Sequence, residues 1–582
     1  MIKRTFILFY FSFIILTSLQ SQTPLRFANL NEQKPSWQSV IGGESVAPIA
    51  ETSYGFAVVS DGRMISACTY SGSVIWQKSI EGKPNKYLSA WGDFLFVITK
   101  DSHISMINPS GVTIWTKNCQ FKITENPIIG WDGRIFIKGK NNLACLGTKG
   151  SIKWTVSCNE TENIPLQFFS DGSLLVFLKE LKNGKTMGLR ISPFGQILEE
   201  IVFAGQVITA QSCKEGVLLS FADGAFGLCA INKNSVESIW VHKDINTPKT
   251  LDYICSKNDK SILCLQNNFN TDVLLIENKT GSLIQKFTLG QLNLKDIQFL
   301  KSTKNGFFIC DSKKALEFTS DGTILFEATL PSKNKWNQIF YTEKNQILLC
   351  LKNWELNSFV MNQSVQNSKI KIKQPEKNYI TSSKTILKID GITYSIPNQD
   401  KIEEIKNTFY TENYSTKEKE MLSMLKEHLE NYITELSSVT KIRTKSHSFY
   451  STNPVFTNTL IEAAANSQTI VFAKDFSALL QLEDDPILLN TLVLNAGKIG
   501  YDKDGEILKS FQMLAVNKIH KNDTLLAKHI CDSTYEIVKF MGRPALYKQG
   551  KTILSNFLYP KYDKEIRDYA RETLSNIINL EL

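Results

Sequence analysis

The sequence lacks the short motifs that mark the common catalytic and nucleotide-binding folds. It has no Gly-x-Ser-x-Gly, which carries the nucleophile of many hydrolases, and no glycine-rich phosphate loop. Histidine is scarce, and no two of the six histidines have the spacing of a ligand pair. The six are His103, His242, His428, His447, His520 and His529. We therefore expect no catalytic residues, no cofactor and no metal ligands.

Closely spaced cysteines are also missing. The eleven cysteines include no adjacent pair and no Cys-x-x-Cys, and none precedes Cys68, which argues against a lipid-modified cysteine behind an export signal. Most stand in apolar runs such as 262–265 and 348–351, where a thiol behaves as a small buried hydrophobic group. We expect free thiols. A disulfide between Cys119 and Cys158, which hold equivalent places in consecutive repeats, is the alternative.

A short apolar run near the N-terminus predicts export. Lys3 and Arg4 precede the nearly unbroken apolar stretch 6–16, and polar or small residues follow to position 22. Because a bilayer needs roughly 20 apolar residues, this stretch is too short to span it comfortably. We predict a signal peptide at 1–22 and a mature chain without a transmembrane span, located in the periplasm or cell envelope. A retained N-terminal anchor is the alternative.

A turn followed by tryptophan recurs along the first two-thirds of the chain. Trp76, Trp115 and Trp154 each follow a glycine (Gly72, Gly111 and Gly150) by four positions, and the three stand 39 residues apart. Trp37 lies another 39 residues upstream. Later repeats keep the register with Glu199, Trp240, Gln285 (after Gly281) and Phe326 (after Gly322). A period near 40 residues built from short strands and Asp-Gly turns is typical of β-propeller blades.

The number of blades depends on how the ring closes. A final strand set, 346–351 and 358–361, has no glycine-plus-aromatic ending of its own. If the strand around Trp37 completes that last sheet, no strand edge is left open and the propeller has eight blades. Seven blades are the alternative, with Trp37 or the last set outside the ring.

The repeat resembles the pyrroloquinoline-quinone-like propeller repeat, in which a Ser-Gly or Thr-Gly turn and then tryptophan end each blade. Ser110-Gly111 and Thr280-Gly281 fit this pattern, whereas Glu199 and Gln285 depart from it. The resemblance implies that the side chains at the tryptophan positions of the repeat pack neighbouring blades against each other. Family members that are quinone-dependent dehydrogenases carry a disulfide between adjacent cysteines, which this chain cannot form. Quinone chemistry is therefore not expected.

From about residue 400 the apolar period becomes helical. We predict a helical linker at 398–455, including a helix over 415–436, after a propeller at 23–397. Helices are then expected at about 456–466, 470–482, 485–497, 503–519, 522–541, 545–558 and 562–580. The stretch from Leu488 to Glu506 resembles a HEAT-type helical repeat, which implies a short solenoid with a concave face over 456–582.

The net charge of +9 is modest for 582 residues and is not gathered into a basic stripe, so nucleic acid is not an expected partner. Two repeat architectures without a reactive centre favour an exported, non-catalytic binding or scaffold protein with envelope protein or peptide partners. The chain looks like the propeller lipoproteins of the outer-membrane β-barrel assembly machinery, but it lacks their lipid-bearing cysteine and adds a helical tail. A small-ligand or quinone-dependent enzyme or sensor, and a surface adhesin-like module, are the alternatives.

Overall fold

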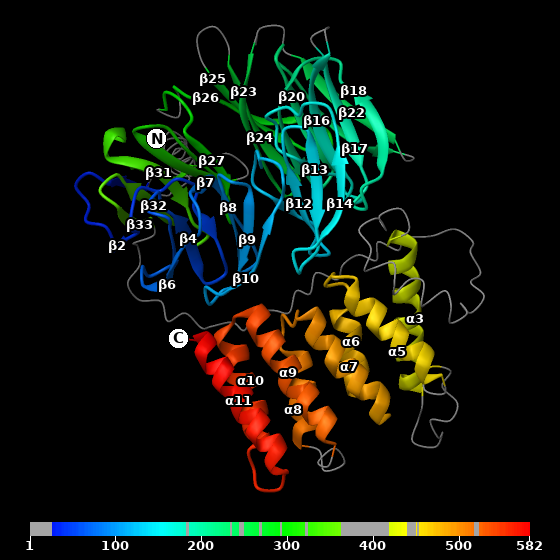
Figure 1. The fold of residues 1–582 in the computed structure, drawn as a ribbon. Coiled ribbons are helices and arrows are strands. Elements are labelled where there is room, and N and C mark those ends of the chain that lie inside the picture. The colour runs from blue at the N-terminus through cyan, green and yellow to red at the C-terminus, as the bar shows by residue number, and fades with distance from the viewer. Residues whose placement is uncertain are drawn as a thin grey trace, which may run out of the picture.

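The computed structural model describes residues 26–181, 185–232, 235–243, 249–266, 271–290, 294–319, 324–361, 418–438, 450, 453–516 and 523–581. The predicted signal peptide, Gly322 and much of the predicted linker lie outside the described residues. The described chain forms eight sheets of a β-propeller, which are followed by a helical domain (Figure 1).

Blades 1 to 4 are four-stranded antiparallel sheets, each built from consecutive strands. Their strands are β3 (Ala50–Glu51), β4 (Gly55–Val59), β5 (Met64–Thr69) and β6 (Val74–Ser79) in blade 1; β7 (Pro84–Trp91), β8 (Phe94–Thr99), β9 (His103–Ile107) and β10 (Thr113–Asn118) in blade 2; β11 (Ile128–Ile129), β12 (Ile135–Lys138), β13 (Asn142–Leu146) and β14 (Ile152–Ser157) in blade 3; and β15 (Gln167–Phe168), β16 (Leu174–Leu181), β17 (Lys185–Ile191) and β18 (Ile197–Val202) in blade 4.

Blades 5 to 8 continue the series, and the last two also take strands from the beginning of the chain. Their strands are β19 (Val207–Cys213), β20 (Gly216–Phe221), β21 (Ala225–Asn232) and β22 (Ser235–Lys243) in blade 5; β23 (Lys249–Lys257), β24 (Lys260–Gln266), β25 (Thr271–Glu277) and β26 (Leu283–Thr288) in blade 6; β27 (Phe299–Ser302), β28 (Gly306–Cys310), β29 (Lys314–Thr319), β30 (Ile324–Thr329) and β1 (Arg26–Asn29) in blade 7; and β31 (Trp336–Tyr341), β32 (Gln346–Leu351), β33 (Glu355–Val360) and β2 (Trp37–Val40) in blade 8, where the short 3-10 turn η1 (Lys333–Lys335) precedes β31.

The ring closes through the beginning of the chain, as predicted for eight blades. β2 pairs antiparallel with β33, with Trp37 opposite Ser358, and so completes blade 8. Apolar side chains of blade 8, including Phe340 and Leu348, then pack against Ile49 and Phe56 of blade 1. The seven-blade alternative is therefore wrong. β1 adds an unanticipated fifth strand, parallel to β30, at the edge of blade 7.

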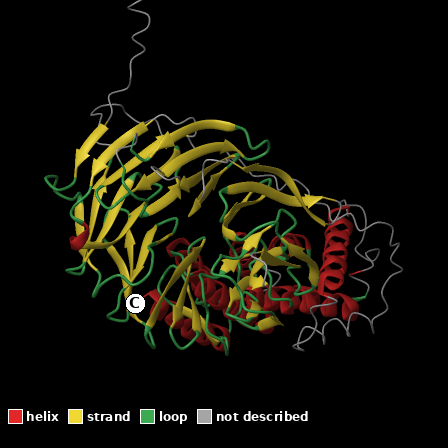
Figure 2. Ribbon diagram, turned by 90° about the horizontal axis from the view of Figure 1, so that it is seen from above, coloured by secondary structure: helices red, strands yellow, loops and turns green. Residues whose placement is uncertain are grey.

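Burial explains why the strands of one blade differ in sequence. Strands within a blade are covered on both faces by neighbouring blades, so β4, β8 and β28 are continuous apolar runs whose side chains are all buried. The outer strand β6 instead alternates between exposed and half-buried residues. Figure 2 shows the sheets fanned around a common axis, with the helices gathered on one side.

The helical domain contains eight described helices, in agreement with the predicted positions. They are α3 (Glu418–Ser438), α5 (Pro454–Asn466), α6 (Ala473–Leu482), α7 (Pro486–Ile499), α8 (Glu506–Val516), α9 (Thr524–Met541), α10 (Pro544–Phe557) and α11 (Lys564–Glu581). Caps set several boundaries. Asp485 accepts hydrogen bonds from two backbone N–H groups at the start of α7, and Gly500 and Gly542 end α7 and α9 with positive φ.

The helices stack as two layers. α5, α7, α9 and α11 pack side by side in one layer, and α6, α8 and α10 form the other. This arrangement is a short stack of helical hairpins. α3 lies within the stretch predicted to be a linker, and it packs against α5 and α6.

The largest apolar core crosses the boundary between the domains. It joins Phe94 and Phe96 of blade 2 and Ile135 of blade 3 to Leu425 of α3 and Phe540 of α9. The helical domain is therefore packed onto the propeller at blades 2 and 3.

Candidate functional site

The tryptophans of the outer strands lie against the glycine turns of the next blade. Each indole N–H (Nε1) donates a hydrogen bond to a backbone carbonyl oxygen of that turn, which satisfies the polar atom of an otherwise apolar ring. The pairs are Trp37 to Tyr70 at 2.9 Å, Trp76 to Pro109 at 2.7 Å, Trp115 to Thr148 at 3.0 Å, Trp154 to Pro193 at 3.0 Å and Trp240 to Asn278 at 2.7 Å.

The turn glycines leave room for these rings. Gly72, Gly111, Gly150 and Gly281 have φ values of 86°, 85°, 82° and 71°, in the left-handed region that favours glycine. A Cβ atom would lie 2.3 Å from Cδ2 of Trp37 at Gly72, 2.7 Å from that of Trp76 at Gly111, 2.6 Å from that of Trp115 at Gly150 and 2.6 Å from that of Trp240 at Gly281. Backbone conformation and the indole of the preceding blade thus both require glycine.

In blade 7 the position equivalent to the tryptophan is occupied by phenylalanine. Phe326 in β30 is 2% exposed and packs with Phe308 and Tyr341 in the core between blades 7 and 8. A phenyl ring has no N–H to donate, so this position contributes apolar packing alone.

The turns of the helical hairpins meet the turns of blades 2 and 3. The Gln468 carbonyl oxygen, between α5 and α6, accepts from the Thr148 hydroxyl at 3.1 Å. The Asn108 amide donates to the Lys539 carbonyl oxygen at 2.6 Å, and the Ser110 and Tyr547 hydroxyls lie 2.7 Å apart.

Apolar and charged contacts reinforce the same junction. The rings of Trp91 and Tyr501 stack with centroids 6.2 Å apart, and those of Phe94 and Phe540 lie 5.3 Å apart. Asp93, beside these rings, forms an ion pair at 2.8 Å with Arg543 at the start of α10. Each hairpin turn therefore has its own contact with the propeller.

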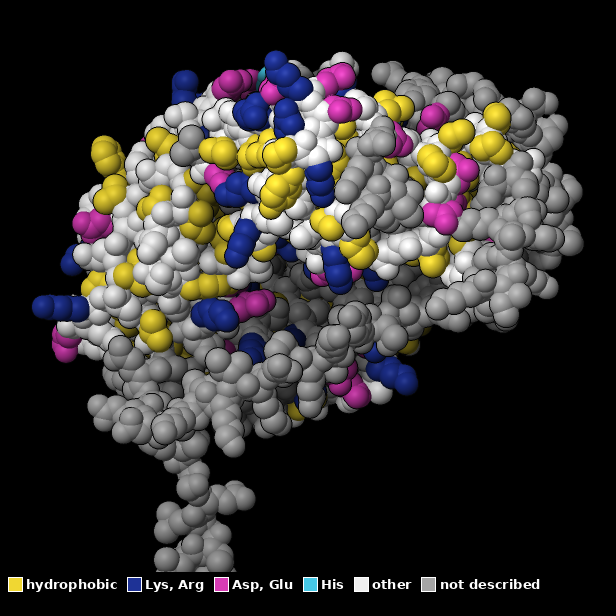
Figure 3. Space-filling model, turned by 90° about the horizontal axis from the view of Figure 1, so that it is seen from below, with side chains coloured by type: hydrophobic (Ala, Val, Ile, Leu, Met, Phe, Trp, Pro, Cys, Tyr) yellow, Lys and Arg dark blue, Asp and Glu magenta, His cyan; other side chains and the backbone are white. Residues whose placement is uncertain are grey.

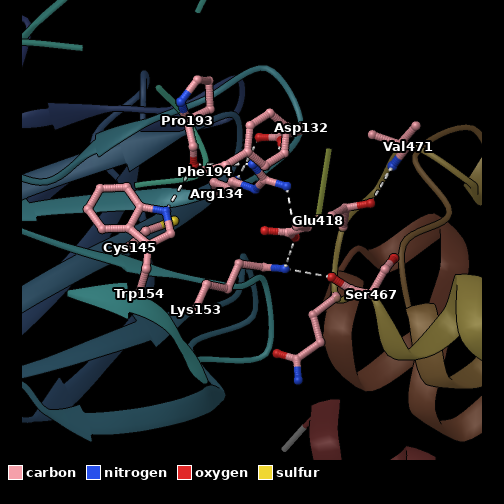
Figure 4. A network of polar contacts seen from close by, with 12 residues as sticks. Asp132, Arg134, Cys145, Lys153, Trp154, Pro193, Phe194, Glu418, Ser467 and Val471 are labelled. Carbon is pink, nitrogen blue, oxygen red and sulfur yellow. Dashed lines mark hydrogen bonds and ion pairs between the residues drawn. The ribbon is translucent and has the colours of Figure 1, made fainter. Parts of the chain in front are cut away.

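A buried charged cluster joins α3 to blade 3 (Figure 4). One carboxylate oxygen of Glu418, Oε1, accepts from Arg134 Nη2 at 2.9 Å and from Lys153 Nζ at 2.8 Å, and all three side chains are 0% exposed. Arg134 Nε also lies 3.1 Å from Asp132 Oδ2, and Lys153 donates to the Ser467 carbonyl oxygen at 2.7 Å. Two cations thus face two carboxylates.

Burial makes this cluster sensitive to the loss of any member. Removal from water lowers the pKa of Lys153, while the adjacent Glu418 carboxylate favours its charged form. The Arg134 guanidinium also lies over the Phe194 ring of blade 4, with its central carbon 4.4 Å from the ring centroid. The three side chains are fully buried at the contact, so the cluster fixes how α3 sits on the propeller.

Sequence patterns did not single out these residues. Asp132 belongs to an Asp-Gly pair that we attributed to turn formation, and Arg134 and Lys153 look like ordinary strand residues. The available signal was a basic residue beside or within an apolar strand, at Arg134 before β12 and at Lys153 in β14, since lysine and arginine are rarely buried without a partner. Their partner Glu418 is more than 260 residues away in the chain, which no local pattern indicates.

The histidines, cysteines and acidic residues are the side chains that could bind a metal. Among the described residues, no three His, Cys, Asp or Glu side chains are placed to hold a metal ion. All eleven cysteines are free, and burial raises the pKa of Cys68 and of Cys119 to about 11. No described helix has both the length and the apolar character needed to cross a membrane.

One exposed aromatic residue stands out beside the junction. Trp131, between β11 and β12, is 74% exposed. It adjoins Asp132, whose carbonyl oxygen accepts a hydrogen bond from Ile470 N of the helical domain at 3.3 Å. A large aromatic side chain is therefore available to solvent where the two domains meet.

These features define an eight-bladed β-propeller with a docked α-helical domain. Solved structures similar to the chain include BamB from Moraxella catarrhalis, at 11% identity and a TM-score of 0.41, which matches 57% of this chain and 99% of its own. Sqt1 from Saccharomyces cerevisiae matches 56% of this chain and 99% of its own at 12% identity and a TM-score of 0.44. The β-propeller domain of Cps50 (Swd1) from Myceliophteria thermophila matches 56% and 99% at 10% identity and a TM-score of 0.35. No protein-family model and no curated protein matches the sequence.

Proposed function

We propose that this chain is a non-catalytic binding or scaffold protein of the cell envelope, and that its propeller turns and helical groove hold a protein or peptide partner. The presence of both charge signs on the face seen in Figure 3 suits such a role better than a nucleic-acid role. On the face seen in Figure 3, Lys and Arg side chains are interspersed with Asp, Glu and apolar side chains.

The observation that carries the proposal is the buried contact between the domains. Glu418, Arg134 and Lys153 fix α3 to blade 3, and Asn108, Tyr547 and their neighbours fix the hairpin turns to blade 2. A partner that touches both domains therefore meets a surface that is already ordered. Such preorganisation lowers the entropic cost of association.

Trp131 is the residue we assign to the partner contact. Tryptophan is enriched among the few side chains that carry most of the binding energy in protein interfaces. Its exposure contrasts with the half-buried or buried state of the docking tryptophans. Delivery to the envelope rests on the export signal predicted at residues 1–22.

Site-specific photo-crosslinking in cells that produce the protein tests this proposal. We expect benzoylphenylalanine at position 131 to capture one discrete partner, identified by mass spectrometry. The matched control is Val202, an exposed outer-strand residue of blade 4, which should capture none. Equal products at both positions, or none at position 131, would contradict the assignment.

A dehydrogenase assay separates the proposal from the enzyme alternative. Dialysed protein supplied with calcium and pyrroloquinoline quinone should show no dye-linked oxidation of alcohols or sugars. Quinone- and calcium-dependent turnover would overturn the non-catalytic assignment.

A further inference from the structure

A pocket lies where the helical layer meets the third blade. Its volume is about 380 Å³, at the lower end of the range of small-ligand sites. Its walls come from the C-terminal halves of α5, α7 and α9, and Lys149, from the turn between β13 and β14, closes it on the propeller side. Gln468, whose carbonyl oxygen already binds Thr148, forms part of the rim.

Lys149, one of the two lysines that line this pocket, makes no ion pair with a described residue. The Lys149 ammonium lies 4.2 Å from the centroid of the Phe540 ring, and no carboxylate of the described residues lies within ion-pair distance of it. Burial lowers the pKa of Lys149 to about 8, although Glu536 opposes this shift. Lys149 is half-buried and its ammonium has no ion-pair partner, so a bound anion would stabilise its charged form.

A buried hydroxyl of the pocket is also unpartnered. Ser533, on α9, is 1% exposed, and its Oγ makes no hydrogen bond in the described structure. It faces Gly497 of α7, where a Cβ atom would lie 2.5 Å from Ser533 Oγ. Because α7 covers this oxygen, Ser533 shapes the pocket wall between α7 and α9 without offering its hydroxyl to a ligand.

The surrounding charges select the kind of anion. Asp532 and Glu536 line the same pocket as Lys149 and Lys498. Two carboxylates beside the site disfavour a dianion such as phosphate, whereas a single negative charge can be accommodated next to Lys149. The Asp532 carboxylate already accepts from the Tyr569 hydroxyl at 2.6 Å, which holds it in place.

We propose that this pocket binds a carboxylate, with Lys149 as its counter-ion. The carboxylate could come from the C-terminus of a peptide or from a free small acid, and the two sources share this chemistry. The peptide source deepens the proposed function and rests on it, whereas carboxylate binding itself does not.

Chemical labelling of Lys149 in the full chain tests the proposal. The protein is acetylated at pH 8 with a water-soluble N-hydroxysuccinimide ester, and the rate at each lysine is measured by mass spectrometry. The probes are a mixed library of N-acetylated tripeptides with free carboxylates, the same library with C-terminal amides, and acetate. Because an adjacent anion favours the unreactive ammonium form, a bound carboxylate should slow labelling of Lys149 about fivefold or more.

The probes separate the two sources. Protection by the free-acid library but not by acetate identifies a peptide C-terminus, and protection by both identifies any small carboxylate. Equal protection by the amidated library, or no protection by either acid, overturns the proposal. Lys509, an exposed lysine on α8 that lies outside this pocket, should label at one rate throughout.

A binding measurement supplies a second readout. Lys149→Met should abolish retention of the free-acid library, whereas the matched Lys509→Met should not, with folding of both checked by circular dichroism. Unchanged binding to folded Lys149→Met would contradict the proposal. If a partner is captured at position 131 but no carboxylate protects Lys149 or depends on it for binding, the pocket proposal is contradicted. The proposed function is not affected by that result.

Discussion

Replacing Glu418 with glutamine should loosen α3 from the propeller. Glu418→Gln keeps the size of the side chain but removes the negative charge that faces Arg134 and Lys153. Both cations remain fully buried, so they cannot recover their hydration without opening the interface. The substitution therefore probes the contact that holds the domains together.

The expected cost follows from the burial of this cluster. Breaking a buried ion pair by removing one partner costs about 3–5 kcal/mol, because the other charge is left uncompensated. An exposed pair is worth about 0–1 kcal/mol. The matched control is Glu420→Gln, which removes the same charge from the first turn of α3 at an exposed position. Loss of a favourable interaction with the helix dipole is common to both variants.

Hydrogen exchange measured by mass spectrometry resolves the effect locally. If α3 exchanges by detaching from blade 3, about 3 kcal/mol corresponds to exchange of its amides roughly a hundredfold faster in Glu418→Gln. Amides of β24, in blade 6, should be unaffected. Equal exchange of the α3 amides in Glu418→Gln and Glu420→Gln would contradict the claim that the buried ion pairs of Glu418 hold α3 on blade 3.

Three further predictions concern the blades, the pocket lysine and the thiols. Gly111→Ala should destabilise the propeller by about 1–2 kcal/mol or more in urea unfolding, since it strains a positive φ and crowds Trp76, whereas the exposed Val74→Ala should change stability by less than about 0.5 kcal/mol. Equal effects would count against the blade-docking contact. Between pH 8 and about 10.4, unfolded Lys149 binds more protons than the folded residue, whose pKa is about 8. Stability should therefore rise with pH across this window, and Lys149→Met should flatten the rise in pH-dependent urea titrations. Burial raises the pKa of Cys68 and Cys119 to about 11, so these thiols should react slowly with an aromatic disulfide reagent at pH 8, while all eleven should react after denaturation. Rapid modification of Cys68 in the folded chain would contradict the burial of this thiol.

The propeller could be predicted because the signals of its repeat lie close together in the sequence. Each glycine and tryptophan pair lies within five residues, and the 39-residue spacing carries the period of the blades. Closure was predictable from one long-range argument, that an open sheet edge needs a strand and that Trp37 lies one period upstream of Trp76. β1 was not anticipated, because the four residues Arg26–Asn29 have no matching turn.

The helical domain was also predictable, since apolar period and caps such as Asp485 and Gly500 are local signals. Its position against blades 2 and 3 was not. That position depends on Glu418, Gln468 and Phe540, whose partners lie hundreds of residues away and whose types are ordinary in helices and turns. This docking brings Lys149 to a pocket whose other lining residues belong to the helical domain, and no sequence pattern could indicate that contact.

Crosslinking from position 131 in the Glu418→Gln background measures whether partner binding requires α3 to be docked on the propeller. If a partner binds the ordered junction of propeller and helical domain, the product captured at position 131 should fall when α3 is loosened and should persist in Glu420→Gln. An undiminished product in Glu418→Gln, with the α3 amides shown to exchange faster, would mean that the partner does not require the docked arrangement.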